Sequence, residues 1–323
     1  MVPTVSFVTT TYNRPGYLRE CLASIRAQTV SNIEIIIVDD ASNSAAMDSL
    51  RQDPTFTDVR FLRHHRNQGS GEARRTGVAA ARGRYIALHD DDDVWDPTVV
   101  DRAIAVMQAD SSVALFCCDA VMIDENGAIL HDGRTFHEIN SAIKRYPIGT
   151  GRRTLEDIFL FSTISMATVV RREVFEKTSY PTSRLMEDYE FQLQVAAAGF
   201  TVFYLHEPLG KYRIHDGNYS GERWIVRTCK RKVEVLEVAL ARTPALQRLG
   251  RRAQRRVADA RMELAIGYAK ARDYPRAAWT LFRSLGQDPW QAREIGRLAL
   301  RWLSRHARQW FKAGTDTVGS KGH

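Results

Sequence analysis

Four consecutive aspartates, Asp90 to Asp93, follow residues 85–88 after a single histidine, and residues 85–88 are an apolar run typical of a buried strand. Neighbouring carboxylates repel one another unless a positive charge relieves them. Carboxylate oxygens are preferred ligands of Mg²⁺ and Mn²⁺, and such an ion relieves the repulsion within an acidic cluster. One or two acids could merely cap the next turn, where Asp96-Pro97 resembles a helix start. Four acids at one strand end favour a cation site.

Two further polar clusters end apolar runs in the same part of the chain. Residues 9–12 (Thr-Thr-Thr-Tyr) end the run that begins at Val5, and Asp39-Asp40 follows residues 33–38. Ligands of α/β sheets bind beyond the carboxyl ends of the parallel strands. We therefore expect the three clusters to line one crevice.

The elements that would position these clusters alternate between strand and helix. Asn13 can cap a helix that has Pro15 in its first turn, and a second helix is expected at residues 71–81. Nearly continuous apolar runs, as in strands covered on both faces, occur at residues 5–9, 33–38, 59–62 and 85–88. Such alternation predicts an α/β fold with a mostly parallel, Rossmann-like sheet and flanking helices.

The second half of the chain continues this pattern and then becomes helical. Strands are expected at residues 113–116 and 164–170, with a turn at residues 125–127, and a helix from Asp188 ends at Gly199. Residues 200–205 predict an edge strand. The expected organisation is an α/β domain at 1–221, an arginine-rich helical region at 222–313 and a disordered tail at 314–323.

Charge and cysteine content limit the class of protein. The net charge is +8, and residues 222–323 hold 23 Lys and Arg against 9 Asp and Glu, so the basic character belongs to the C-terminal part and favours an anionic partner there. The four cysteines lack CxxC spacing, which argues against a zinc site and favours reduced thiols. With neither a signal peptide nor an apolar run long enough to span a membrane, a cytoplasmic location is expected.

Five sequence blocks follow one another in about residues 3–220: VSFVTTTYNRPGYLRECLASIRAQ, IEIIIVDDAS, NQGSGEARRTGVAAARGRYIALHDDDDVWDP, MEDYEFQLQVAAAGF and KYRIHDGNYS. In these blocks and their order the sequence resembles the family 2 glycosyltransferases of the GT-A fold, specifically their small soluble bacterial members. The resemblance implies a nucleotide-sugar donor, a divalent cation (Mn²⁺ or Mg²⁺) and a saccharide or lipid-linked acceptor, with no nucleic acid. It also implies that residues 1–221 are the catalytic domain, with a nucleotide-binding part at about 1–98 and an acceptor part at about 99–221.

The family's DxD motif fits the acidic run in two registers, Asp90-x-Asp92 or Asp91-x-Asp93. The first is favoured, because it aligns Trp95 with the family's aromatic position, a residue that would shape the site or meet the acceptor. The resemblance then implies that Asp92 binds the metal. Asp90 or Asp91 would contact the ribose.

The resemblance also implies how the donor is recognised. Asp40 matches the aspartate that accepts a hydrogen bond from uracil N3–H, Tyr12 can stack on the base, and Thr10 offers further contacts, so UDP is the default nucleotide. An Asx-turn with Ser42 is the alternative for Asp40. Arg74 corresponds to an arginine expected near the donor.

Catalysis is assigned to the MEDYEF block. The resemblance implies that Asp188 takes the proton of the acceptor hydroxyl and that Glu187 lies beside the acceptor or shapes the site. A first-turn acid at a helix N-terminus would explain Asp188 as well. One base suffices, because the diphosphate leaves without a proton, and direct displacement inverts the anomeric configuration.

His215 ends a Tyr-Arg-x-His segment that the family places near the pyrophosphate. It could ligate the metal or donate to a phosphate oxygen, and a solvated loop histidine is the alternative. The remaining candidates for histidine chemistry lack a ligand-like context and are predicted to be surface residues: His64, His65, His131 and His137.

The basic C-terminal region leaves several roles open. Tryptophans and arginines interleave in a predicted last helix at residues 294–312, which suits either an anionic bilayer, at the inner face of the cell membrane, or packing on the core with an arginine side in solvent. Residues 223–312 could also form a homodimer surface. The alternative to an enzyme is an inactive transferase-like scaffold that binds membrane or a partner through this tail; a sugar-nucleotide pyrophosphorylase is disfavoured, because its glycine-rich loop is absent.

Overall fold

The computed structural model describes residues 2–43, 45–139, 149–161, 166–218 and 224–287. The chain forms two compact units, Met1–Leu249 and Gly250–His323. The predicted boundary at residue 221, the last helix at 294–312 and the tail at 314–323 lie outside the described residues and stay predictions.

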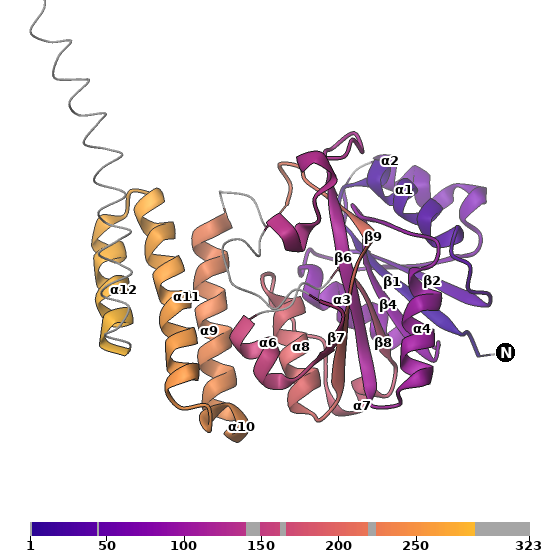
Figure 1. Cartoon of the computed structure of the whole chain (residues 1–323). Coiled ribbons are helices and arrows are strands. Elements are labelled where there is room, and N and C mark those ends of the chain that lie inside the picture. Colours follow the sequence, from indigo (N-terminus) through magenta and orange to yellow (C-terminus); the bar gives the residue numbers. More distant parts are fainter. Residues whose placement is uncertain (1, 44, 140–148, 162–165, 219–223, 288–323) are drawn as a thin grey trace, which may run out of the picture. The chain divides into compact units, whose positions relative to one another are not determined.

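A nine-stranded mixed sheet organises the described part of the first unit, in the order β3-β2-β1-β4-β8-β6-β9-β5, with β7 pairing with β9 (Figure 1). Because polar residues end several of these strands, the topology decides which side chains meet. The strands are β1 (Val5–Thr11), β2 (Ile33–Asp39), β3 (Val59–Arg63), β4 (Tyr85–Asp90), β5 (Val94–Trp95), β6 (Val113–Ile123), β7 (Gly151–Arg153), β8 (Met166–Arg171) and β9 (Thr201–Arg213).

The N-terminal half of the sheet is parallel, as the apolar runs predicted. Strands β1 and β2, β1 and β4, and β2 and β3 pair in parallel. All residues of β1 are buried, which fits strands covered by helices on both faces. The α/β fold class is confirmed.

The C-terminal half departs from a simple parallel order. Strand β8 runs antiparallel between β4 and β6, whereas β6 and β9 are parallel. The prediction of an edge strand at residues 200–205 is wrong, because β9 extends to Arg213 and pairs with β5 and β7 on its second side. Strands of two and three residues carry too little sequence pattern to be predicted.

Helices cover both faces of the parallel half. Side chains of α1 (Pro15–Arg26), α2 (Ala45–Gln52) and α4 (Val99–Ala109) pack with Phe7 and Ile37 in one apolar core. Alternate strand residues point to the opposite face, where α3 (Ser70–Ala80) packs on β1 and β2. Both faces of the parallel half are therefore covered by helices, and the polar groups concentrate at the strand ends.

Two glycines bring α3 unusually close to its neighbours. A Cβ at Gly77 would collide with Val8, and one at Gly71 would collide with the carbonyl oxygen of Pro181. The second approach holds the start of α3 against the segment that precedes α8 (Glu187–Ala197). This juxtaposition brings Arg74 to the MEDYEF block.

The other described helices complete the two units. In the second unit α11 and α12 pack together, and Ser284 Oγ donates to the carbonyl oxygen of Ala258 at 2.8 Å. The remaining elements are η1 (Pro54–Phe56), η2 (His131–Gly133), α6 (Leu155–Phe161), α7 (Val174–Lys177), α9 (Ile225–Arg242), α10 (Pro244–Gln247), α11 (Arg251–Lys270) and α12 (Tyr274–Gln287).

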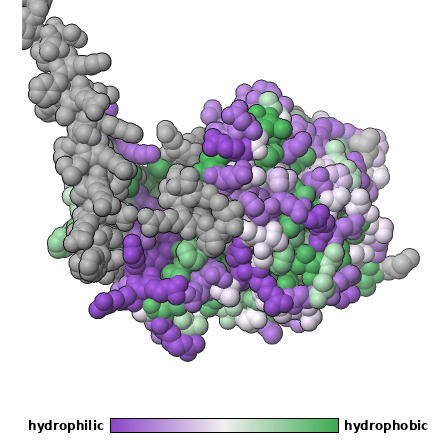
Figure 2. All heavy atoms as spheres, in the orientation of Figure 1, coloured by the Kyte–Doolittle hydropathy of each residue, from purple (hydrophilic) through white to green (hydrophobic). Residues whose placement is uncertain are grey.

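None of the helices in the described ranges is both long and apolar enough to cross a bilayer. Figure 2 shows hydrophobic residues interspersed with hydrophilic ones on the visible face of the described residues.

Candidate active site

The three polar strand ends meet, as expected. In the β1–β2 pair Thr11 lies opposite Asp39, and in the β1–β4 pair Thr10 lies opposite Asp90. The backbone N–H of Asp40 also donates to the carbonyl oxygen of Thr11 at 2.9 Å. The acidic turn is therefore adjacent to the end of β1, whose other side pairs with the end of β2.

The four aspartates of the acidic turn, Asp90 to Asp93, have different environments. Asp91 is fully buried, whereas 40% of the Asp90 side chain is exposed. Asp93 is buried, and its Oδ1 accepts the backbone N–H of Arg213 in β9 at 3.1 Å. This contact ties Asp93 to the sheet, and the Asp90-x-Asp92 register stays a prediction.

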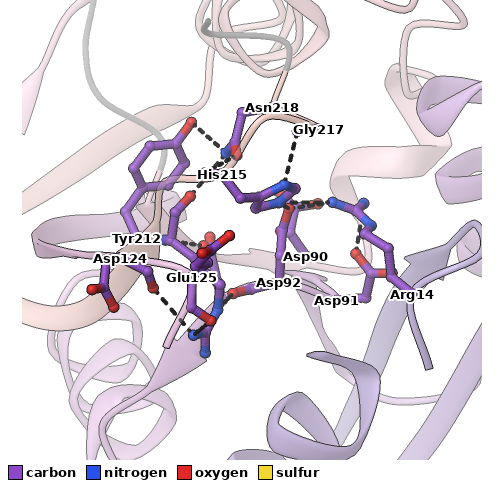
Figure 3. Close-up of polar contacts among 12 residues, drawn as sticks. Arg14, Asp90, Asp91, Asp92, Asp124, Glu125, Tyr212, His215, Gly217 and Asn218 are labelled. Carbon is purple, nitrogen blue, oxygen red and sulfur yellow. Dashed lines mark hydrogen bonds and ion pairs between the residues drawn. The ribbon is translucent and has the colours of Figure 1, made fainter. Parts of the chain in front are cut away.

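Arg14, at the start of α1, supplies the positive charge next to these carboxylates. Its Nη2 lies 2.7 Å from Asp91 Oδ1, and its Nη1 donates to Asp92 Oδ2 (Figure 3). Burial raises the pKa of Asp91 to about 7, although Arg14 opposes this shift. Burial would also raise the pKa of Asp92, but a hydrogen bond from His215 and the charge of Arg14 outweigh it, so this pKa is lowered.

His215 lies over the acidic turn and is not a solvated loop residue. Its side chain is 8% exposed, and its Nε2 lies 3.0 Å from Asp92 Oδ2 (Figure 3). The backbone N–H of Gly217 donates to its Nδ1 at 3.0 Å. The neutral ring therefore carries its proton on Nε2 and donates to Asp92.

The acidic turn fits a divalent cation held by few protein ligands. Among the described residues, no group of three or more His, Cys, Asp or Glu side chains is gathered to hold a metal ion. Mg²⁺ commonly keeps several waters and binds through one or two carboxylates together with substrate phosphates. The Asp92 carboxylate, beside the part-exposed Asp90, meets that requirement. A bond from Nε2 of His215 would first require this atom to lose its proton.

Arg74 joins the acidic turn to the MEDYEF block. Its side chain is 6% exposed and pairs with Asp90 through Nη2. Its Nη1 donates to Glu187 Oε1 at 3.1 Å, and Ser70 Oγ donates to the same oxygen at 2.6 Å. Glu187 is thus buried in a polar network and does not face solvent.

Asp188 lies next to this network but remains accessible. Its side chain is 46% exposed, and its Oδ1 is 3.5 Å from Arg74 Nη1. The hydroxyl of Tyr180 donates to the same oxygen and accepts a hydrogen bond from Arg74 Nη1 at 3.1 Å. Burial raises the pKa of Tyr180 well above its usual value, so the hydroxyl stays protonated. One carboxylate oxygen of Asp188 is therefore held in place, and the accessible side can face a ligand.

This contact gives a prediction for Tyr180. Tyr180→Phe should lower kcat roughly tenfold and change KM little, because it removes one hydrogen bond that orients Asp188 without opening a cavity. The measurement is steady-state hydrolysis of the nucleotide-sugar donor. Tyr189→Phe on α8, whose hydroxyl donates to the carbonyl oxygen of Ile158, is the matched control. An unchanged kcat in Tyr180→Phe would contradict the role.

Asp40 is buried and already accepts several hydrogen bonds from the protein. The backbone N–H groups of Gln68 and Gly69 lie 2.9 and 2.7 Å from its oxygens, and His64 Nδ1 is 2.7 Å from Oδ1. Asp40 therefore fixes the loop before α3, and a base N3–H would have to share or displace one of these donors. Tyr12 is 43% exposed and free to meet a base, whereas Thr10 is buried.

Trp95 packs inside the molecule. It is 4% exposed and stacks on His89, with ring centroids 4.3 Å apart. Burial lowers the pKa of His89 to about 4, so this ring is neutral. Trp95 can therefore shape the acidic turn only through its packing on His89, the residue before Asp90.

Two of the four histidines predicted at the surface are not there. His64 contacts Asp40 and Thr76, and its side chain is 9% exposed, while His137 is 7% exposed. Both predictions are wrong, because partners far along the chain cover these rings. His65 and His131 are exposed, as predicted.

Sequence reasoning missed three residues that organise the site: Arg14, Tyr180 and Arg213. Arg213 is 1% exposed, and its Nε donates to the carbonyl oxygen of Asp92 at 2.9 Å. Its place in the Tyr-Arg-x-His segment was a usable signal. Tyr180 had none, since no motif marks it and its partner Arg74 lies 106 residues away.

Comparisons with known proteins identify the family. The sequence profile of Glycosyl transferase family 2 matches residues 6–179, and the chain belongs to this family. The succinoglycan biosynthesis protein ExoO of Rhizobium meliloti is 31% identical over 208 residues, which are 61% of this chain and 57% of ExoO. The chain is therefore a glycosyltransferase, as the resemblance implied.

Solved structures share the fold. The mannosyltransferase PcManGT from Pyrobaculum calidifontis, in complex with GDP-Man and Mn²⁺, superimposes with a TM-score of 0.60 at 17% identity, over 100% of this chain and 89% of that one. TarS residues 1–349 from S. aureus, in complex with UDP-GlcNAc, gives a TM-score of 0.56 at 15% identity, over 86% and 90%. The fold is therefore GT-A.

Proposed function

We propose that the protein is an inverting, metal-dependent glycosyltransferase that moves a sugar from a nucleotide-sugar donor to a hydroxyl acceptor. One observation carries the proposal: Arg74 contacts Asp90 of the acidic turn and also Glu187 and Asp188. One buried guanidinium therefore contacts both the acidic turn, which we assign to the diphosphate, and the accessible carboxylate that we assign as the base. A transferase needs both a leaving-group site and a base.

On the donor side, Asp92 would hold a divalent cation, Mn²⁺ or Mg²⁺, that neutralises charge on the departing diphosphate. Asp90 and Asp91 flank it and suit ribose or water contacts. His215 suits donation of its Nε2 proton to a phosphate oxygen; metal ligation is the second role open to it. A complex with Mn²⁺ in the similarly folded PcManGT supports the cation.

On the acceptor side, Asp188 would receive the proton of the attacking hydroxyl. The hydrogen bond from Tyr180 fixes one oxygen of its carboxylate. Attack and departure then occur on opposite sides of the anomeric carbon, so a single displacement inverts its configuration. A second carboxylic acid is not required, because the diphosphate is a good leaving group.

UDP is the proposed nucleotide, because Asp40 and Tyr12 match the family's base-binding positions. The UDP-GlcNAc complex of TarS supports it, whereas the GDP-Man complex of PcManGT shows that the same fold also accepts GDP. Asp40 already accepts hydrogen bonds from the protein, and a base N3–H would compete with them. The assignment of UDP is therefore the first to test.

The acceptor we propose is a saccharide or lipid-linked saccharide in bacterial polysaccharide or glycoconjugate synthesis. The likeness to a succinoglycan biosynthesis protein supports it. A lipid-linked acceptor would place the protein at the inner face of the cell membrane. The basic C-terminal region would then contact the membrane or form a dimer surface.

The test is calorimetric titration of UDP and GDP into the protein, with Mn²⁺ and with EDTA. UDP should bind tightly only with Mn²⁺, and Asp92→Asn should weaken this binding roughly 100-fold, because the cation loses a buried carboxylate partner. Asp101→Asn, an exposed aspartate on α4, is the control. If neither nucleotide binds under any condition, an inactive scaffold is the better description.

A further inference from the structure

Arg14 projects from a loop whose backbone is held firmly. Asn13, the residue before it, has a left-handed conformation with φ 57°. Its N–H donates to Ser42 Oγ at 2.8 Å, and its Oδ1 accepts the N–H of Asn43 at 2.9 Å. The β1–α1 loop is thus clamped to the end of β2, and any movement of Arg14 belongs to its side chain.

The Arg14 guanidinium lies among the groups that the proposed function assigns to the metal and diphosphate. It contacts Asp91 and Asp92, and its Nη1 is 3.5 Å from His215 Nε2 (Figure 3). Asp92 Oδ2 therefore faces two donors, Arg14 Nη1 and His215 Nε2. A cation that binds this oxygen must displace one of them.

Arg14 is the donor that can leave. Its side chain is 32% exposed, whereas that of His215 is 8% exposed and held by the N–H of Gly217. A long side chain at the rim can move into solvent or toward a ligand with little rearrangement. Asp91, which is fully buried, cannot follow it.

We propose that Arg14 is a resident counter-cation: it neutralises Asp91 and Asp92 while the donor site is empty, and a divalent cation displaces it when the nucleotide binds. This inference rests on the proposed function. The displaced guanidinium then pairs with the diphosphate, for which its planar fork is well suited. Arg14 thus exchanges one set of anionic partners for another, and the acidic turn is never left without a counter-charge.

The first experiment measures thermal unfolding of the full chain in EDTA and in Mn²⁺ without nucleotide. Arg14→Met should be less stable than wild type in EDTA and should recover in Mn²⁺, while wild type changes little. Arg19→Met, on the same helix and ion-paired to Asp53, removes the same charge and should show neither effect. Arg14→Lys, which keeps the charge but not the fork, should fall between and remains informative if Arg14→Met fails to fold in EDTA.

The second experiment measures affinity for Mn²⁺ alone and for UDP in the presence of Mn²⁺. Arg14→Met should bind Mn²⁺ alone roughly tenfold more tightly than wild type, because the competing cation is gone, and UDP several-fold more weakly. Equal Mn²⁺ affinity in wild type, Arg14→Met and Arg14→Lys would overturn the inference. Failure of wild type to bind any nucleotide with Mn²⁺ would instead overturn the proposed function, and the Mn²⁺ titrations would still decide the role of Arg14.

Discussion

Asp188→Asn is expected to lower kcat for sugar transfer by about 10² to 10⁴-fold, the usual contribution of a positioned general base. The amide cannot accept the hydroxyl proton, but it keeps the shape of the carboxylate and can still accept the hydrogen bond from Tyr180. Binding of UDP with Mn²⁺ should persist, because Asp188 makes its ion pair with Arg74, which in turn contacts the acidic turn, and does not itself belong to that turn. Product formation by chromatography and UDP binding by calorimetry measure the two effects separately.

Glu190→Gln is the matched control for this prediction. Glu190 lies in the same turn of α8 and pairs with Arg231 at 2.6 Å, away from the acidic turn. Glu190→Gln removes the same charge at the same end of α8, and the variant should retain nearly full activity. Equal turnover in Asp188→Asn and wild type would remove Asp188 as the base; loss of UDP binding along with turnover would show that it serves the donor site.

The parallel half of the fold was predictable because a strand that is buried on two faces is a nearly continuous apolar run in the sequence. Strands β1, β2 and β4 are nearly continuous apolar runs, and helices with periodic apolar residues separate them. The C-terminal half was predictable only in part: strands were expected where β6 and β8 lie, but β5 and β7 are too short to show a pattern. Their pairing with β9 depends on segments about 50 or more residues away, as in the Arg152–Phe203 and Trp95–Gly210 pairs.

The acids of the site were predictable, but most of their partners were not. A run of aspartates at a strand end is visible in the sequence, since the strand places it. Arg14 lies 78 residues from Asp92, Tyr180 lies 106 residues from Arg74, and Arg213 lies 121 residues from Asp92. Only the assembled sheet brings such partners together.

Asp40 shows a different limit. Its place after β2 puts it beside the end of β1, where its backbone N–H donates to the carbonyl oxygen of Thr11. The bonds its carboxylate accepts from Gln68 and Gly69 could not be foreseen, because the conformation of that loop has no signature in residue type. A motif therefore locates a side chain more reliably than it defines its partners.

Arg213→Met is expected to destabilise the protein by about 3 kcal/mol, because it leaves buried carbonyl groups without their donor. Besides Asp92, the guanidinium donates to the carbonyl oxygens of Asp124 and Glu125, at 3.3 and 3.2 Å. It also pairs with Glu20 at 2.5 Å and lies 4.8 Å from the ring centroid of Tyr17. Since Glu20 is 54% exposed, water can replace that partner, and the carbonyls account for most of the loss.

Thermal unfolding should therefore show Arg213→Met melting roughly 6 to 12 °C below wild type. Arg19→Met loses an ion pair that is half exposed and should melt within about 2 °C of wild type. Arg213→Lys keeps the charge next to Glu20 but cannot reach three carbonyls at once, so its melting temperature should fall between them. If the melting temperature of Arg213→Met equals that of Arg19→Met, the three carbonyl oxygens already have other hydrogen-bond donors. The arginine of the Tyr-Arg-x-His segment would then be present for the diphosphate rather than for the architecture of the acidic turn.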